Sequence, residues 1–367
     1  MVVFRAIAIV AVLALVSASV SLPGAAASST RTPTKVSPPA QQYVMAFHGC
    51  KPGAGDCNNP SSHEVYLAQS NDGASWSLLP GWEPRDGSVP DVFRRGDTLY
   101  VISTGGVSRL NMQTGDVTHE KVTIEGGENY VDPSLAQLPD GRLVMFYLPG
   151  IMGQDPASCA PGEGSCTRQI KSAVEVPGSN GTVFRADSGA RVAETITGGT
   201  FSDPDIFFNG SEWVLYVSRG PSINAYTSAD LQGTFSYRGP VSQSQGGVGS
   251  GIQASPGVVQ TFAHASTRDS TVIVRGESAT GTTPIATFAT VITGPSIGLG
   301  NYVASPGVAL NTPGITCGLC NASSSAQTST VVKKRIKCVK GNKTKFVKGV
   351  KPKCPKGFKK VGKTVKL

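Results

Sequence analysis

Three stretches of the sequence share one pattern: Val89-Pro90-Asp91-Val92, Tyr130-Val131-Asp132-Pro133 and Phe201-Ser202-Asp203-Pro204. Each stretch places an aspartate at the start of a short apolar strand. A turn that contains glycine follows, and then a second strand rich in aromatic and β-branched residues, at residues 98–103, 142–147 and 212–217. Each unit is therefore predicted to be a β-hairpin that begins with an aspartate.

Two weaker copies flank these units. Residues 42–47 open the series, and residues 252–262, with a Pro256-Gly257 turn, close it. Five units between residues 41 and 297 give a pitch of about 51 residues, which is typical of four-stranded propeller blades. The region lacks a sustained helical period, and a β-sandwich gives no reason for the aspartates to recur. The sequence predicts an all-β, five-bladed β-propeller, with six blades if the 71 residues from Asp132 to Asp203 contain another.

The amino-terminal end has the composition of an export signal. Residues 6–22 are apolar or small, and Ala25-Ala26-Ala27 offers a cleavage site. We expect a signal peptide at 1–27, a linker at 28–40, the propeller at 41–310, a second linker at 311–330 and a tail at 331–367. The protein is then secreted, either extracellular or associated with the cell wall, with no membrane span after cleavage, and monomeric.

The charge is divided unevenly along the chain. The formal net charge is +9, but residues 331–367 contain 15 Lys+Arg and no Asp or Glu. The other 330 residues contain 18 basic and 24 acidic residues, a net charge of −6. This division excludes a uniformly basic nucleic-acid-binding domain. Because lysine is a poorly directional charge, we expect the tail to bind an anionic cell-wall polymer, with no nucleic-acid partner; a solvated solubility tail is the alternative.

The eight cysteines are spaced as four local pairs, which fits an oxidising compartment. We expect the disulfides Cys50–Cys57, Cys159–Cys166, Cys317–Cys320 and Cys338–Cys354, the last stapling a small basic β-hairpin in the tail. Eight cysteines allow 105 connectivities, so the pairing is a hypothesis. A zinc site built from the last four cysteines is the alternative.

At these motifs the chain resembles the five-bladed glycoside hydrolases of family 43 and related arabinanase-like proteins. Residues 130–134 with Pro139-Asp140-Gly141, and residues 201–205 with Asn209-Gly210, carry the resemblance. Residues 70–76 also look like a sialidase Asp-box shortened by one residue, which we interpret as a structural turn. The resemblance covers roughly residues 41–297 and implies a carbohydrate substrate.

The resemblance implies catalytic carboxylates in a funnel at the propeller axis, at Asp91, Asp132 and Asp203. It further implies substrate contacts near that funnel, expected at Glu128, Tyr130, Asp205 and Arg219. A histidine in the last blade of such enzymes lies near an axial cation, so His264 is the expected metal-binding residue and Ca²⁺ the expected ion. The chain departs from the family in having no aspartate at residues 43–47 and no glutamate equivalent to Asp132.

Two functional hypotheses follow. One is a glycoside hydrolase, which needs two carboxyl groups across the scissile bond, one of them protonated. The other is a non-catalytic propeller that binds a glycan or the cell wall. The aspartates could also only cap the amides of the turns that they begin, since Asp-Pro is a common turn starter.

Overall fold

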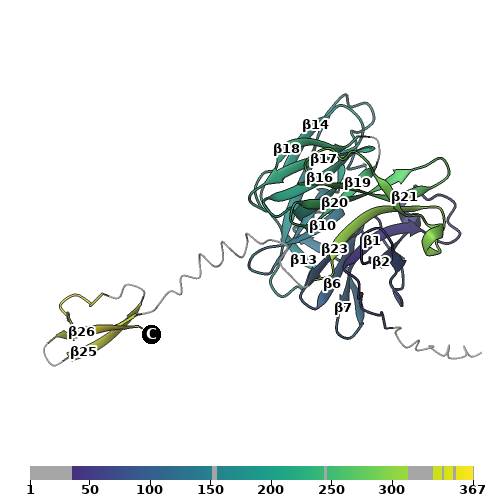
Figure 1. The fold of residues 1–367 in the computed structure, drawn as a ribbon. Helices are drawn as coiled ribbons and strands as arrows, with labels where there is room; N and C mark the ends of the chain where they lie inside the picture. Colours follow the sequence, from purple (N-terminus) through teal and green to yellow (C-terminus); the bar gives the residue numbers. More distant parts are fainter. Residues whose placement is uncertain are drawn as a thin grey trace, which may run out of the picture. The chain divides into compact units, whose positions relative to one another are not determined.

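The computed structural model describes residues 35–150, 155–243, 246–312, 334–340, 343–349 and 353–366. Within these ranges the fold is all-β, with five sheets that form the blades of a propeller and a sixth, separate sheet near the carboxyl terminus (Figure 1). The inner strands of the five blades contact one another in the cyclic order β5, β10, β15, β19, β23. The prediction of a five-bladed β-propeller is confirmed.

Each blade is an antiparallel sheet numbered here in chain order. Blade 1 contains β23 (Val303–Leu310), β1 (Tyr43–Cys50), β2 (His63–Ser70), β3 (Ser77–Leu78) and β4 (Arg85–Asp86). Blade 2 contains β5 (Asp91–Arg95), β6 (Thr98–Ser103), β7 (Gly106–Asn111) and β8 (Val117–Glu120). Blade 3 contains β10 (Tyr130–Gln137), β11 (Leu143–Pro149), β12 (Cys166–Glu175), β13 (Val183–Ala186) and β14 (Val192–Ile196), and β9 (Thr123–Glu125) joins it in parallel.

The last two blades are regular. Blade 4 contains β15 (Ser202–Phe208), β16 (Trp213–Arg219), β17 (Ser222–Ser228) and β18 (Ser236–Ser242). Blade 5 contains β19 (Gly247–Ser255), β20 (Val258–Ser266), β21 (Thr271–Ser278) and β22 (Ala289–Ile292). Two short 3₁₀ helices, η1 (Pro60–Ser62) and η2 (Pro295–Ile297), lie in connections.

Blade 1 closes the ring with strands from both ends of the propeller. Strand β23 pairs antiparallel with β1, and the two labels lie side by side in Figure 1. Residues 42–47, expected to begin the first repeat unit, therefore belong to a second strand, and β23 supplies the inner one. The sequence pattern missed β23 because it lies some 260 residues from its partner. The closing hairpin at 252–262 is confirmed as part of β19 and β20.

The long gap between Asp132 and Asp203 contains no sixth blade in the described residues. It holds the outer part of blade 3, in which β12 pairs with β11 and β13 at one end and with the additional strand β14 at the other. The loop before β12 carries the Cys159–Cys166 disulfide. An extended third blade therefore accounts for the irregular spacing of the aspartates.

The apolar core consists of five clusters, one between each pair of neighbouring blades. Successive side chains of a strand point to opposite faces, and both faces of a blade are covered. In β11, for example, Leu143, Met145 and Tyr147 pack towards blade 2, whereas Val144, Phe146 and Leu148 pack towards blade 4. This two-sided burial explains the continuous apolar runs in the sequence.

The carboxyl-terminal sheet, sheet G, contains β24 (Lys334–Lys340), β25 (Lys343–Gly349) and β26 (Lys359–Lys366). The predicted hairpin is β24 with β25, and β26 adds a third strand on the other side of β24. The Cys338–Cys354 disulfide is present, as are Cys50–Cys57 and Cys159–Cys166. Since Cys338 and Cys354 are bonded to each other, the zinc alternative is wrong.

Several predictions concern residues outside the described ranges. The proposed signal peptide, most of both linkers and the Cys317–Cys320 pair fall there. Among the described residues, no helix is long and apolar enough to cross a membrane. The Asp-box-like turn is described, and it is structural: Asp72 accepts hydrogen bonds from the Ala74 and Ser75 amides, and Trp76 packs edge-on against Phe262.

Candidate functional site

The inner strands share a strained backbone position at their amino-terminal ends. Five of the six non-glycine residues with positive φ among the described residues lie there, one per blade, with φ between 46° and 52°. We call these the rim positions: Val89, Asp132, Asp203, Val248 and Ser305. In four blades the strand pairing also shifts at this point, as in a β-bulge. Positive φ is costly for side chains other than glycine, and such strain is often found at functional sites.

Two residues further along each strand lies a second set, the ring positions: Asp91, Ser134, Asp205, Ser250 and Gly307. Four of these side chains accept a hydrogen bond from a backbone amide of the next blade. Asp91 Oδ2 accepts from the Leu135 N–H (2.7 Å) and Ser134 Oγ from the Ile206 N–H (3.1 Å). Asp205 Oδ2 accepts from the Gly251 N–H (2.8 Å) and Ser250 Oγ from the Val308 N–H (3.0 Å). The ring positions thus join the blades around the axis.

Asp91 has a central place in this ring. Its Oδ1 also accepts from its own neighbour, the Val92 N–H (2.7 Å), and its Oδ2 from the Ser134 hydroxyl (3.1 Å). Gly307 completes the ring without a side chain, because a Cβ there would lie 2.6 Å from the Asp91 Cα. Burial raises the pKa of Asp91 to about 6, although these hydrogen bonds favour its ionised form. Its carboxylate is buried and accepts all of these hydrogen bonds from backbone amides and the Ser134 hydroxyl.

The three predicted catalytic aspartates therefore do not occupy equivalent positions. Asp132 and Asp203 are rim residues, whereas Asp91 is a ring residue two positions deeper. The proline after each rim residue marks the true register, since Pro90, Pro133 and Pro204 are equivalent. Aligning the three motifs on their prolines, and not on their aspartates, gives this register. The structure brings Asp132 and Asp203 together and sets Asp91 apart.

Asp132 and Asp203 lie on adjacent blades, half-buried, and form one carboxylate pair. The Asp203 N–H donates to Asp132 Oδ2 (3.4 Å), and the Ser202 hydroxyl donates to Asp203 Oδ2 (2.6 Å). Burial, followed by the charge of Asp203, raises the pKa of Asp132 well above its ordinary value. Burial raises the pKa of Asp203 to about 6, partly offset by the Ser202 and Ser218 hydroxyls. The negative charge of Asp203 thus favours the protonated form of Asp132.

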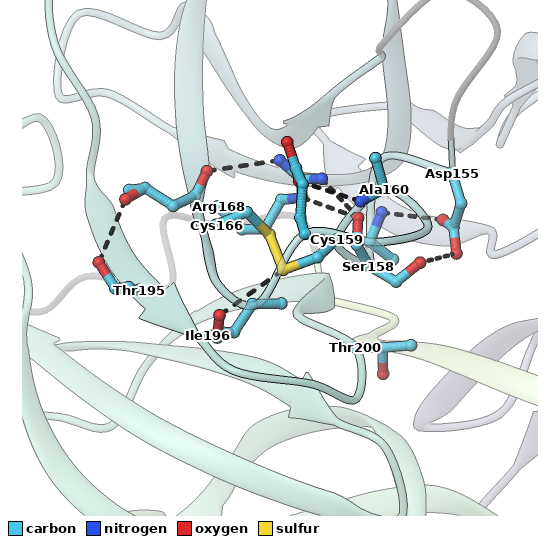
Figure 2. Close-up of a disulfide and its surroundings, with 12 residues drawn as sticks. Asp155, Ser158, Cys159, Ala160, Cys166, Arg168, Thr195, Ile196 and Thr200 are labelled. Carbon is cyan, nitrogen blue, oxygen red and sulfur yellow. Dashed lines mark hydrogen bonds between the residues drawn. A yellow bond between two sulfur atoms is a disulfide. The ribbon is translucent and has the colours of Figure 1, made fainter.

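The disulfide loop of blade 3 brings a third acidic residue to this pair. Asp155 raises the pKa of both Asp132 and Asp203 through its charge. Its carboxylate accepts from the Ala157 N–H (2.9 Å) and the Ser158 hydroxyl (2.6 Å). Figure 2 shows Asp155 at one end of the loop, with Arg168 donating to the Ser158 carbonyl beside the disulfide. Nothing in the local sequence around Asp155 indicates this approach, so the sequence patterns do not predict it.

Glu128 and Tyr130 line a cavity of about 340 Å³ just before and at the start of β10. Lys171 Nζ donates to Glu128 Oε1 (2.6 Å) and the Tyr147 hydroxyl to Oε2 (2.9 Å). The Tyr130 hydroxyl donates to the Ser103 carbonyl (3.2 Å). Both residues thus lie on the amino-terminal side of the inner strands, in a cavity bordered by blades 2 and 3.

The other two predicted substrate contacts have different surroundings. Arg219, at the end of β16, donates to the Thr200 carbonyl (2.7 Å) and lies 3.6 Å from the Glu194 carboxylate. Asp205 is a ring residue, 8% exposed, and it lies near Asp91, whose charge raises its pKa further after burial has raised it. Asp91 and Asp205 line an axial cavity of about 330 Å³, together with residues from all five inner strands.

His264 lies in β20, opposite Gly247, and burial lowers its pKa to about 4. A second histidine, His48 of β1, was not singled out by the sequence patterns; burial, followed by the charges of His63 and His264, lowers its pKa well below its ordinary value. His48 Nδ1 accepts from the N–H of the rim residue Val89 (3.1 Å), and His48 stacks on His63 with ring centres 3.9 Å apart. The lowered pKa values of His48 and His264 favour the neutral form of both side chains.

His264 Nδ1 is buried without a hydrogen-bond partner among the described residues, as is His48 Nε2, and a Ca²⁺ ion near His264 stays a prediction. Calcium takes six to eight oxygen ligands. The one cluster of three potential metal ligands in the described residues is Cys159, Glu163 and Cys166, where both sulfurs form a disulfide. No such cluster includes His264 in the part of the chain that the structure describes, so we derive no step through a metal.

No protein-family model matches the chain, and no curated protein matches it in sequence. Solved structures do match its fold. A family 43 β-xylosidase/α-arabinofuranosidase from a compost metagenome, solved with xylotriose, is 15% identical (63% of this chain, 86% of that one, TM-score 0.42). An endo-arabinase from Bacteroides thetaiotaomicron is also 15% identical (63% and 88%, TM-score 0.41).

A family 117 glycoside hydrolase from Zobellia galactanivorans is 15% identical with a TM-score of 0.36. The match covers 46% of this chain and 59% of that protein, which is less than two thirds of its length. These similarities, all at low sequence identity and with TM-scores below 0.5, are to glycoside hydrolases that include a member of family 43. The similarity concerns the fold, and the chemistry rests on the residues of the site itself.

Proposed function

We propose that this protein is a secreted glycoside hydrolase that acts on a polysaccharide through the rim pair Asp132 and Asp203. The observation that supports it is the pairing of two half-buried carboxyl groups whose pKa values are both raised. Glycosidic bond cleavage needs one protonated carboxyl group to assist the leaving oxygen and one ionised group opposite. Export is supported by three disulfides, which are typical of proteins that fold in an oxidising compartment.

The environments of the two carboxyl groups assign their roles. The pKa of Asp203 is raised to about 6, and that of Asp132 is raised further by the charge of Asp203. Burial and the charge of Asp203 both favour the protonated form of Asp132. Asp132 is therefore the general acid, and Asp203 is the base or nucleophile.

Asp91 has a positioning role in this proposal. By accepting from Leu135 and Ser134 it holds the middle of β10, the strand that carries Asp132. Asp205 joins β15 to β19 in the same way. Glu128, Tyr130 and Arg219 lie on the amino-terminal side of the blades, where we expect them to contact the glycan beside the scissile bond.

A glycan-binding propeller without catalysis is the second candidate. It is favoured by the composition of the rim, where Val89, Val248 and Ser305 occupy the other three positions. Asp91, the carboxylate that would complete a catalytic trio, is fully engaged by backbone amides and Ser134. This candidate predicts binding to polysaccharide without cleavage.

A panel of aryl glycosides and of xylo- and arabino-oligosaccharides distinguishes the two. Wild-type protein, Asp132→Asn and the control Asp140→Asn, an exposed turn residue of the same blade, are assayed for cleavage and for binding. Cleavage by wild type and the control but not by Asp132→Asn is the expected result. Binding without cleavage supports the second candidate, and full cleavage by Asp132→Asn contradicts the proposed role of the pair.

We also propose that the tail anchors the protein to an anionic cell-wall polymer. The 15 basic residues of 331–367 have no acidic side chain among them to neutralise their charge. Deleting 331–367 should abolish salt-sensitive retention on cell walls. Unchanged retention would show that the tail has another role.

A further inference from the structure

A cavity of about 720 Å³ lies between blades 1 and 5, and we call it the blade 1–5 cavity. Three segments form its walls: the disulfide loop after β1, the turn between β20 and β21, and the residues just before β23. Asn58, Arg268 and Asn301, one from each segment, are exposed, so the cavity is open to solvent.

The blade 1–5 cavity is on the same face of the propeller as the rim positions. Gly49 of β1 pairs with Val303, the first residue of inner strand β23, so the loop after β1 continues beyond the amino-terminal end of that strand. His264 of β20 pairs with Gly247, the first residue of β19, so the turn at 266–271 does the same. The rim pair belongs to blades 3 and 4. A ligand that contacts both the pair and the cavity must therefore extend across this face.

The wall from blade 1 is held in place at several points. The Cys50–Cys57 disulfide closes the loop, and His63 Nε2 donates to the Cys57 carbonyl (2.8 Å). Lys51 Nζ lies 2.9 Å from an Asp86 carboxylate oxygen, which balances its charge. A wall that is ordered before binding lowers the entropy lost when a ligand binds.

Tyr302 supplies an aromatic wall whose orientation is fixed. Its ring stacks on the imidazoles of His48 and His63, with ring centres 5.9 Å and 5.5 Å away. The half-buried ring also lines the cavity. Because His48 accepts from the N–H of the rim residue Val89 (3.1 Å), this stack joins the cavity wall to the rim.

The other lining side chains are mostly polar and balanced in charge. Asn58, Asn301 and the hydroxyl groups of residues 266–271 offer donors and acceptors. Arg268 and Asp269 carry opposite charges side by side. Hydroxyl and amide groups beside an aromatic ring suit a sugar, which has hydroxyl groups at its edge and an apolar C–H face. The balanced charge favours a neutral sugar over an acidic one.

We propose that the blade 1–5 cavity binds a neutral stretch of the polysaccharide, remote from the bond that is cleaved at the rim pair. A sugar ring packs on Tyr302, and its hydroxyl groups bond to Asn58, Asn301 and the turn at 266–271. The assignment rests on the proposed function, and it names the substrate class: a neutral glycan chain long enough to cross the propeller face.

Gly300 offers a way to fill the cavity without disturbing its walls. A Cβ at Gly300 would meet no atom within 4 Å, and Gly300 is not among the glycines with positive φ. Gly300→Trp can therefore place a ring in the cavity without backbone strain. Gly55→Trp is the matched control, because Gly55 has the same freedom in the disulfide loop and does not line the cavity.

The experiment measures binding of the full chain, by calorimetry, to neutral xylo- and arabino-oligosaccharides from the disaccharide to the octasaccharide. We expect wild type and Gly55→Trp to bind more tightly as the chain lengthens, and Gly300→Trp to lose this gain. Tyr302→Ala should weaken binding of the octasaccharide about three- to ten-fold, whereas Tyr302→Phe should retain it. For a chain that is cleaved, Gly300→Trp should raise KM and leave kcat unchanged, because the cavity lies away from the reacting bond.

Thermal unfolding identifies the variants that are folded. An equal gain with length in Gly300→Trp and wild type overturns the inference. Tighter binding of oligogalacturonides than of neutral chains also overturns it, as does no binding of any neutral chain. If binding rises with length, Gly300→Trp removes the rise and no substrate is cleaved, the proposed hydrolysis has failed while the cavity keeps its assignment.

Discussion

The rim and ring positions differ by two residues along the same strand and have opposite surroundings. Rim carboxylates are half-buried, carry few hydrogen bonds and crowd one another, so their pKa values rise and a proton is retained. Ring side chains are buried and accept backbone amides from the next blade. Along one inner strand, two residues therefore separate the proposed catalytic carboxylates from the side chains that join neighbouring blades.

Asp203 and Asp205 offer the sharpest test of this difference. Asp203→Asn should lower kcat/KM by about 10²- to 10⁴-fold, because the base or nucleophile is lost, while stability stays within about 0.5 kcal/mol. Asp205→Asn should show the reverse balance, losing more stability than activity. Steady-state kinetics and urea unfolding of both variants give the comparison. Equal effects of the two substitutions on activity and on stability would contradict the different roles proposed for rim and ring carboxylates.

Asp91→Ala should reduce the free energy of unfolding by about 2–4 kcal/mol, since it leaves the buried amides of Val92 and Leu135 without acceptors. Urea denaturation measures the loss. Asp97→Ala, in the exposed turn after β5, serves as the control and should be nearly neutral. A loss below about 1 kcal/mol would show that the ring hydrogen bonds add little.

The two disulfides with a sequence separation of 7 form a matched pair. Replacing either pair by serine should cost about 2 kcal/mol, because each closes a loop of the same length. Only Cys159→Ser/Cys166→Ser should also reduce hydrolysis, since that loop carries Asp155 towards the rim pair. Thermal unfolding and activity assays separate the two effects. Equal activity in both variants would argue against a role for the Asp155 loop.

The smallest effect concerns the pH profile. Activity should rise as pH rises through about 6, because Asp203 must lose its proton to act as the base. Asp155→Asn removes a negative charge that raises the pKa of both rim carboxyls, so the acidic limb of kcat/KM should move to lower pH by less than about one unit. Asp140→Asn should leave the limb in place. A shift to higher pH would contradict the assigned charge effect.

Local patterns were sufficient for much of this protein. The hairpin repeats predicted the blades, and cysteine spacing predicted three disulfides that the structure contains. The same patterns aligned aspartates that are not equivalent. A shift of two residues along a strand keeps every side chain on the same face, so the hydrophobic pattern does not distinguish the two registers. Proline at 90, 133 and 204 was the available signal for the true register.

The sequence by itself determined the all-β class, a propeller of five or six blades and the uneven charge between propeller and tail, because hydrophobic alternation, turn residues and composition are local properties. Only the tertiary structure decided the closure of blade 1 by β23, the pairing of Asp132 with Asp203 and the approach of Asp155. Each joins residues distant in the chain, and a carboxyl group's pKa depends on burial and neighbouring charges that exist only once those segments meet.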